Sequence, residues 1–417
     1  MKLKKFENIK FIQGGVCAAK GFKANGIQCG LAHAGAEITQ KKNDLALIVS
    51  DKTCTAAAVY TTNKVKGAPI LVTKEHIKDG TAKAVIVNSV NANTCNADGV
   101  EKANKMCALA ASQLGISENE IVVASTGVIG QTLPIEPIAN GMKTLCDGLS
   151  YDGNKAALEA IMTTDTMPKE IAVQFEMGGK ICTMGGMLKG SGMIHPNMAT
   201  TLTFITTDAD ISAELVQRAL SDVVKITLNR VSVDGDTSTN DMVLVMASGA
   251  AGNTTVSKEN SDFEIFENAL YAILLNLARM MARDGEGATK LVECMCTGAE
   301  TEKIAETVAK SVITSSLFKT MIFGEDANCG RIFCALGYSD ADFDINKVDI
   351  EIESVAGKIA VGKNGNVIEF SEDTAKKILQ EEEIKVIISI GDGAASAVAW
   401  GCDLTYNYVK INGDYRS

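Results

Sequence analysis

The sequence predicts an α/β protein in which layered sheets pack closely against helices. Hydrophobic residues make up 46% of the 417 positions, which is enough apolar material for a large core. Aromatic residues contribute only 5% while glycine occurs 37 times, so small and β-branched side chains must fill the interior. Between residues 82 and 149, short apolar runs alternate with helically spaced segments, and this βαβ-like rhythm is typical of the α/β class. The length suggests two or three domains or lobes.

The first half of the chain contains both kinds of element. Apolar runs separated by turn-like polar residues predict strands, whereas apolar residues three and four positions apart predict helices. We therefore expect two or three strands in 44–75, a strand entering an Asn-rich loop in 82–95, a helix over 98–115, a strand that breaks into a Gly-rich turn in 120–134, and a helix over 135–149.

The rest of the chain, from residue 178 onward, is predicted to continue in the same way. The glycine-rich segment 178–192 is expected to be the least structured join, and a Thr-rich strand follows it. The sequence GDGAAS, after a predicted strand, is expected to open an Ala-rich helix. Further helices are predicted over 212–231 and 262–287, and further strands within 348–370 and 383–393.

Charge and composition exclude several classes of function. The net charge is -11 without a basic block, which makes nucleic-acid binding unfavourable. The N-terminal residues lack the apolar core of a signal peptide, and no run of about 18 apolar residues predicts a membrane span. We therefore expect a cytoplasmic protein with no membrane partner. Its twelve scattered cysteines are then expected to be reduced thiols.

No metal or cofactor motif is complete. Only three histidines occur, far apart, and no CxxC pair is present, so a zinc site is not expected. The run 234–241, DGDTSTND, resembles the start of a calcium loop but has Thr239 and Val245 where glycine and glutamate are required. The turn 391–396, GDGAAS, lacks the third glycine of a dinucleotide fingerprint. We therefore expect no metal and no prosthetic group.

One stretch in the middle of the chain permits unusual chemistry. In KGSGMIHPNMATTLTFITTDAD (189–210), a small residue, Ala199, precedes Thr200. A threonine whose hydroxyl attacks the preceding carbonyl cuts the chain and becomes N-terminal. Its own α-amine, with an ordinary pKa of about 7.7–8.0, can then serve as the base. Residue types alone leave two readings open, an ordinary Thr-rich strand or self-cleavage before Thr200.

Taken together with other strings along the chain, this stretch closely resembles the ornithine acetyltransferase family, also called bifunctional glutamate N-acetyltransferase. The strings occur in the family order and span essentially the whole sequence. They are DLALIVSD, YTTNKVKGAP, NSVNANTCN, ASTGVIGQTLP, MTTDTMPK, RVSVDGDTSTND, ARDGEGATK, GEDANCGRI and YVKINGDYRS.

The resemblance implies roles for individual residues. Thr200 matches the nucleophile that cleavage of the Ala199–Thr200 bond releases, and Thr126 and Gly127 match the pair that stabilises the oxyanion. Substrate contacts are implied for Thr200 itself and for Thr163, Lys189, Glu286, Asn412 and Ser417. A lysine suits the substrate carboxylate, and a glutamate suits the amine of ornithine.

The implied activity is transfer of an acetyl group from N-acetylornithine to glutamate through a Thr200 acyl-enzyme. The family fold is α/β, with sheets sandwiched between helices. Cleavage would leave an α chain (1–199) and a β chain (200–417), the latter divided into 200–285 and 286–417, and two such pairs would form a heterotetramer. No cofactor is implied, and the sequence leaves open whether acetyl-CoA is also a donor.

The chain departs from the family pattern at a few positions. Thr201 stands where a larger apolar residue is common, which places a second hydroxyl beside the nucleophile. Ser417 replaces a frequent threonine, and Ala327 and Cys329 replace a proline and an aromatic residue. Two other functions remain to be separated by experiment. One is an N-terminal-nucleophile amidase or aminopeptidase of related fold, and the other is an uncleaved binding protein.

Overall fold

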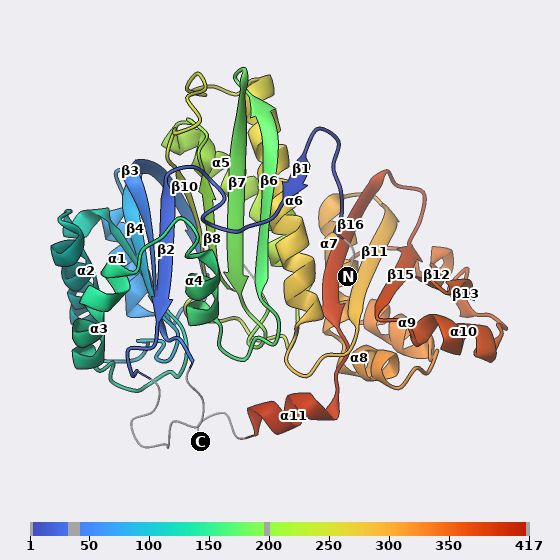
Figure 1. The fold of residues 1–417 in the computed structure, drawn as a ribbon. Coiled ribbons are helices and arrows are strands. Elements are labelled where there is room, and N and C mark those ends of the chain that lie inside the picture. Colours follow the sequence, from blue (N-terminus) through green and yellow to red (C-terminus); the bar gives the residue numbers. More distant parts are fainter. Residues whose placement is uncertain (1–2, 32–41, 196–200, 414–417) are drawn as a thin grey trace.

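The computed structural model describes residues 3–31, 42–195 and 201–413 and consists of two mixed β-sheets with helices packed on them (Figure 1). One sheet has nine strands and the other seven. In Figure 1 the nine-stranded sheet occupies the left and centre of the molecule, and the seven-stranded sheet lies to the right. This architecture confirms the predicted α/β class.

The nine-stranded sheet follows the order β1-β6-β7-β8-β10-β3-β4-β5, with β2 paired to β3. The β4–β5 and β8–β10 pairs are parallel, and the other pairs are antiparallel. Its strands are β1 (Lys10–Ile12), β2 (Phe22–Ile27), β3 (Leu45–Tyr60), β4 (Thr81–Asn88), β5 (Ile121–Ser125), β6 (Lys169–Met177), β7 (Lys180–Lys189), β8 (Leu202–Thr207) and β10 (Met242–Ala247).

The seven-stranded sheet follows the order β14-β13-β12-β15-β11-β16-β9. Its β11–β15 and β16–β9 pairs are parallel. Its strands are β9 (Val231–Ser232), β11 (Leu291–Ala299), β12 (Asp349–Ser354), β13 (Gly357–Lys363), β14 (Asn366–Val367), β15 (Glu383–Ser389) and β16 (Ala395–Cys402).

Helices flank both sheets. The α-helices are α1 (Ala68–His76), α2 (Gly99–Leu114), α3 (Ile135–Asp147), α4 (Asn154–Ile161), α5 (Ala213–Ile226), α6 (Ser261–Arg283), α7 (Glu302–Thr314), α8 (Ser316–Phe323), α9 (Gly330–Gly337), α10 (Glu372–Leu379) and α11 (Tyr406–Asn412). Three short 3-10 turns are η1 (Glu118–Glu120), η2 (Leu228–Arg230) and η3 (Ile345–Lys347).

Helix α6 lies between the two sheets and joins their cores. It packs on β6 and β7 of the first sheet and on β11 and β16 of the second. Helix α7 also contacts β11 and β16, but on the opposite face of the sheet. Successive side chains of β16 point to opposite faces, so Trp400 packs in the core beside α6 and Ala399 in the core beside α7. The second sheet is therefore enclosed by helices on both faces.

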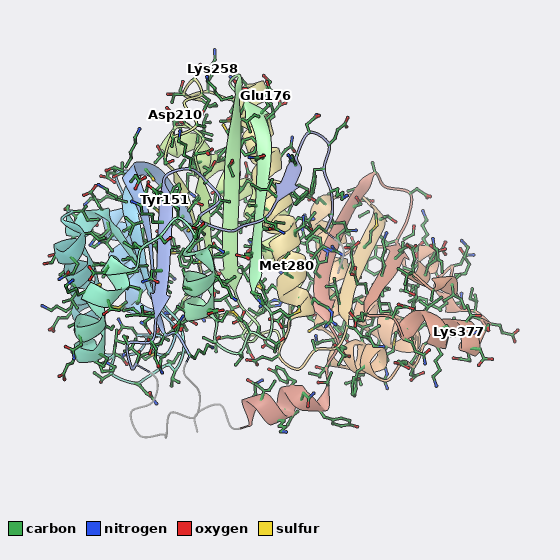
Figure 2. The ribbon with its side chains drawn as sticks, viewed as in Figure 1. Tyr151, Glu176, Asp210, Lys258, Met280 and Lys377 are labelled. Carbon is green, nitrogen blue, oxygen red and sulfur yellow. The ribbon has the colours of Figure 1, made fainter. Side chains whose placement is uncertain are left out.

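By length and composition, α6 is apolar enough to cross a membrane, but 72% of its most apolar window is buried inside the protein. Asn260 caps its N-terminus by accepting a hydrogen bond from the Phe263 N–H at 3.0 Å. Charged side chains elsewhere, such as Lys258 and Lys377, project outward from the molecule (Figure 2). Because most of its apolar surface is buried, α6 is the central core helix of this fold.

One predicted element in the first half needs correction. The segment 44–75 was expected to hold two or three strands, but it contains the single long strand β3 and most of α1. Pro69 lies at the start of α1, where its fixed φ favours helix initiation and its missing N–H costs no hydrogen bond. The helices predicted over 98–115 and 135–149 are present as α2 and α3.

The chain from residue 178 onward contains three differences from prediction. The segment 178–192 is mainly strand β7, because its glycines allow close packing between the neighbouring strands and helix α6. The alanines after Gly393 form strand β16 rather than a helix, since they pair with β11. The helix predicted over 212–231 ends at Ile226, and η2 and β9 complete the segment.

Candidate active site

A cavity of about 540 Å³ opens at one end of the nine-stranded sheet. The end of β7 and the starts of β8 and β10 meet there because β7 runs antiparallel to β8, which runs parallel to β10. Segments following β5, α4 and α6 and the end of α11 complete its wall. Six residues predicted to act in the site line this cavity, namely Thr126, Gly127, Thr163, Lys189, Glu286 and Asn412.

Two of the predicted site residues, Thr200 and Ser417, lie outside the described residues. Thr201 is described, lines the cavity and is buried. Its carbonyl accepts the Met242 N–H at 2.8 Å, which fixes the start of β8 beside the start of β10. The Thr201 hydroxyl is hydrogen bonded to the Thr203 hydroxyl. The hydroxyl next to the predicted nucleophile is therefore already engaged by a residue of β8.

Thr126 and Gly127 follow the last residue of β5. The Thr126 N–H donates to the Asn88 carbonyl at 3.0 Å, which leaves its hydroxyl as the group available to the cavity. Gly127 has a φ of 126°, and a Cβ there would lie 2.0 Å from the Val90 carbonyl oxygen. Only glycine fits this backbone. Among the described residues, no acceptor takes the Gly127 N–H, so a hydroxyl and a free N–H come together at this turn.

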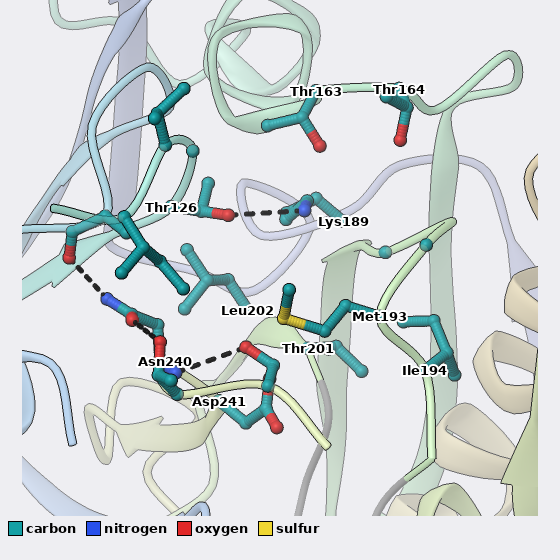
Figure 3. Close-up of a pocket in the computed structure, with 18 of the residues that line it drawn as sticks. Thr126, Thr163, Thr164, Lys189, Met193, Ile194, Thr201, Leu202, Asn240 and Asp241 are labelled. Atoms are coloured by element: carbon teal, nitrogen blue, oxygen red, sulfur yellow. Dashed lines mark hydrogen bonds between the residues drawn. The ribbon is translucent and has the colours of Figure 1, made fainter. Parts of the chain in front are cut away.

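Lys189 is the last residue of β7 and is 8% exposed. Its amine donates to the Thr126 hydroxyl at 3.3 Å, as the dashed line in Figure 3 shows. Within the described ranges, no carboxylate lies within 4.0 Å of this amine. Burial lowers the pKa of Lys189, and the charge of Asp165 opposes that shift. The site thus contains a buried lysine amine without a direct counter-ion.

Thr163 lies in the turn after α4, on the same side of the cavity as Lys189 in Figure 3. Its N–H donates to the Asp165 carboxylate at 3.0 Å, and its carbonyl accepts the Lys42 amine at 2.7 Å. Burial lowers the pKa of Lys42, while Asp165 raises it. The backbone N–H and the backbone carbonyl of Thr163 are therefore both held by charged side chains, which fixes this wall of the cavity.

The acidic wall of the cavity is built by Glu286 and Asn412. The Asn412 amide donates to Glu286 Oε2 at 2.7 Å, which joins helix α11 to the segment that follows α6. Glu286 is 7% exposed, and its N–H donates to the Ser191 carbonyl at 3.0 Å. A Cβ on Gly192 would lie 2.3 Å from the Glu286 carboxylate, so the chain needs glycine where this carboxylate passes. A carboxylate so enclosed suits an ammonium group.

Asp241 is a further cavity residue that the sequence did not single out. It immediately precedes β10, is 3% exposed, and its Oδ2 has no hydrogen-bond partner among the described residues. Burial raises the pKa of Asp241 well above its ordinary value, although the Lys189 charge opposes the shift. Asp241 is the last residue of the motif RVSVDGDTSTND. In the sequence, only its position directly before an apolar strand could have indicated that it lies in the site.

A buried ion cluster behind the cavity was also missed. Asp165 and Lys169 lie in MTTDTMPK and Asp284 lies in ARDGEGATK, but neither string reveals that these three side chains meet. Across the described part of the chain, no group of three or more His, Cys, Asp or Glu side chains is arranged to hold a metal ion. The cavity therefore offers a hydroxyl, a backbone N–H, one cation and enclosed carboxylates, which suits binding of a charged amino-acid derivative beside an oxyanion site.

The comparisons with known proteins agree with this chemistry. A family model described as the ArgJ family matches residues 28–417. A relative from Clostridium acetobutylicum, "Arginine biosynthesis bifunctional protein ArgJ 1", is 48% identical over 397 residues, which cover 95% of this chain and 96% of the relative. A relative from Caldanaerobacter subterraneus, "Arginine biosynthesis bifunctional protein ArgJ", is 46% identical over 410 residues, covering 98% of this chain and 100% of its own.

A solved structure is also similar. The crystal structure of ornithine acetyltransferase from Mycobacterium tuberculosis, complexed with ornithine, is 32% identical in sequence. The match covers 46% of this chain and 100% of that chain, with a TM-score of 0.41.

Proposed function

The chain belongs to the ArgJ family, and we propose that it transfers the acetyl group of N-acetylornithine to glutamate through an acyl-enzyme on Thr200. It is an acyltransferase of arginine biosynthesis. The observation that best supports the proposed chemistry is the pairing of Lys189 and Glu286 on the walls of one cavity beside Thr126 and Gly127. N-acetylornithine carries a carboxylate and an amine at opposite ends, which matches these two charges.

The first half-reaction is proposed to begin with the amine of an N-terminal Thr200. That amine takes the proton of the Thr200 hydroxyl as the oxygen attacks the acetyl carbonyl of N-acetylornithine. The Thr126 hydroxyl and the Gly127 N–H then donate to the oxyanion of the tetrahedral intermediate. The C–N bond breaks as the ornithine nitrogen takes this proton from the Thr200 ammonium group, and ornithine departs while the acetyl group remains as an ester on Thr200.

The second half-reaction reverses these steps with a different amine. Glutamate binds, and the Thr200 amine takes a proton from the α-amine of glutamate. The glutamate nitrogen attacks the ester carbonyl. The same oxyanion donors stabilise the intermediate, and collapse returns the proton to the Thr200 hydroxyl and releases N-acetylglutamate. The cavity groups Lys189 and Thr163 are proposed to hold the α-carboxylate common to both substrates.

The proposed maturation cuts the chain between Ala199 and Thr200. The products would be residues 1–199 and 200–417, and they would remain associated because β8 and β10 from the second fragment pair with β7 and β3 from the first. We further propose that two such pairs assemble as a heterotetramer in the cytoplasm. Ser417 is proposed as a contact from the C-terminal tail, next in the chain after helix α11.

The maturation is tested with two matched variants. Thr200→Ala is expected to stay as one full-length band on a denaturing gel and to lose transfer completely, because both the attacking hydroxyl and the released nucleophile are absent. Thr201→Ala is the control, since its hydroxyl is engaged with Thr203 and cleavage before residue 200 remains open. N-terminal sequencing of the second fragment should begin Thr-Thr-Leu-Thr. A start at Thr201 would reassign the nucleophile.

Transfer is distinguished from hydrolysis by the acceptor. Purified protein is incubated with N-acetylornithine with and without glutamate, and ornithine and N-acetylglutamate are quantified. Ornithine release that does not depend on glutamate would favour an amidase of related fold over the transferase. An uncleaved protein without turnover would favour a binding protein. A parallel assay with acetyl-CoA and glutamate determines whether this donor also supplies the acetyl group.

A further inference from the structure

Asp165 belongs to a buried ion cluster directly behind the proposed carboxylate site. Lys169, the first residue of β6, contacts the carboxylates of Asp165 and Asp284, and the three side chains are between 0% and 2% exposed. The Lys169 amine lies 2.6 Å from Asp165 Oδ1. Charges buried to this degree are tolerated only when they are compensated by partners. The cluster therefore has a defined geometry that substitution would disturb.

The Asp165 carboxylate connects the two walls that carry Thr163 and Lys189. One oxygen accepts the Thr163 N–H at 3.0 Å. The other accepts the Gly190 N–H at 2.8 Å, immediately after Lys189, and also the Lys169 amine. A single side chain thus sets the backbone on both sides of the position where the substrate carboxylate is proposed to bind.

Asp284 extends the cluster toward the acidic wall by different contacts. Its carboxylate accepts the Thr166 N–H at 3.1 Å, and its carbonyl accepts the Ser191 hydroxyl at 2.6 Å. The Ser191 carbonyl in turn accepts the Glu286 N–H. Asp284 shares Lys169 with Asp165, but no hydrogen bond joins it to Thr163 or Gly190 among the described residues. It therefore provides a matched comparison within the same cluster.

We propose that Asp165 is a positioning residue for the substrate carboxylate, acting through Thr163 and Lys189 rather than by touching substrate. This inference rests on the proposed function, because it assigns a carboxylate to that part of the cavity. Besides its own burial, the pKa of Lys189 is influenced by the carboxyl groups of Asp165, Asp241 and Glu286, which favour its cationic form, and by Lys169, which opposes it. Lys42 also faces this group, since the Lys189 charge lowers the pKa of Lys42.

The role of Asp165 predicts a specific pH dependence. Burial would raise the pKa of the Asp165 carboxyl, but the charges of Lys169 and Lys189 hold it below its ordinary value, so Asp165 is anionic at neutral pH. Replacing it with asparagine removes the charge that opposes the lowering of the Lys189 pKa by burial. Lys189 then loses its proton at a lower pH, and carboxylate binding weakens earlier as the pH rises.

The test measures ornithine binding by calorimetry from pH 7 to pH 10, since ornithine has the carboxylate but no acetyl group to transfer. Asp165→Asn is expected to raise Kd about tenfold at pH 7 and to shift the alkaline loss of binding to lower pH. Asp284→Asn is expected to weaken binding less and to leave the pH profile close to wild type. Taking the ratio of variant to wild type at each pH removes the ionisation of ornithine itself.

The outcomes separate the two proposals. If the wild type transfers acetyl groups and Asp165→Asn and Asp284→Asn have the same Kd and pH profile, Asp165 is only structural and the inference is overturned. A wild type that neither binds ornithine nor transfers acetyl groups overturns the proposed function and this inference together. If Asp165→Asn does not fold, Asp165→Glu replaces it. We expect Asp165→Glu to keep the pH profile while its displaced carboxylate weakens binding, and unchanged Kd would contradict the inference.

Discussion

Two buried lysines on neighbouring strands, Lys169 and Lys189, have opposite electrostatic surroundings. Lys169 begins β6 and its amine contacts two carboxylates, whereas Lys189 ends β7 and, among the described residues, its amine hydrogen bonds only to the Thr126 hydroxyl. The two ends are adjacent, because Lys169 lies opposite Leu188 in the β6–β7 register. A buried charge needs compensation from some source. The protein supplies it directly for Lys169, and we infer that the substrate supplies the direct partner for Lys189.

The largest expected effect comes from breaking the compensated site. Lys169→Met leaves the carboxylates of Asp165 and Asp284 buried without their cation, and we expect the free energy of unfolding to fall by about 3–5 kcal/mol. Denaturant unfolding followed by circular dichroism measures this change. Lys143→Met is the control, since the Lys143–Asp147 pair is exposed and its loss should leave stability nearly unchanged. Equal effects of the two substitutions would refute the structural role of Lys169.

The second prediction concerns the lysine without a direct counter-ion. Lys189→Met is expected to lower kcat/KM for N-acetylornithine by about two orders of magnitude, because the substrate carboxylate loses its buried cation. Stability should be unchanged or slightly higher, since the cost of burying an ammonium group disappears. Steady-state kinetics and denaturant unfolding of the same preparation test both parts. A large loss of stability with normal kinetics would make Lys189 resemble Lys169.

The pH dependence sharpens the same comparison. Burial lowers the folded-state pKa of Lys189 below the ordinary 10.5, so between the two values the unfolded chain binds more protons than the folded protein. Stability from this group therefore rises with pH through that window, while carboxylate binding falls as Lys189 becomes neutral. We expect KM to increase toward pH 10 as stability from this residue increases. A KM that is constant over the range would contradict a cationic role for Lys189.

The smallest expected effect lies on the acidic wall. Asn412→Ala removes the amide that donates to Glu286, and we expect KM for N-acetylornithine to rise by less than about tenfold, with little change in stability. Lys410→Ala on the same helix is the control, because Lys410 is exposed and does not line the cavity. If the two variants have identical kinetics, the bond between α11 and Glu286 is irrelevant to binding.

The sequence was most informative where local patterns are sufficient. Helix α2 begins and ends close to its predicted bounds, and Gly115 adopts the left-handed conformation of a helix C-cap. Sequence reasoning failed at β7 and β16, whose glycines and alanines look like turn and helix residues. The strand conformation of β7 depends on pairing with β6 and β8, and that of β16 on pairing with β11. A local sequence pattern does not show these pairings.

By itself, the sequence determined the α/β class, and its motifs indicated the family and the candidate residues Thr126, Gly127, Thr163, Lys189, Glu286 and Asn412. Only the tertiary structure decided that these six line one cavity, and that Asp165, Lys169 and Asp284 meet behind it. The physical reason is that a sequence motif shows only which residues are neighbours along the chain, whereas charge compensation depends on which residues are close in space. Lys169 and Lys189 are the same residue type in the sequence, and only their neighbours make one a structural ion and the other a candidate binding group.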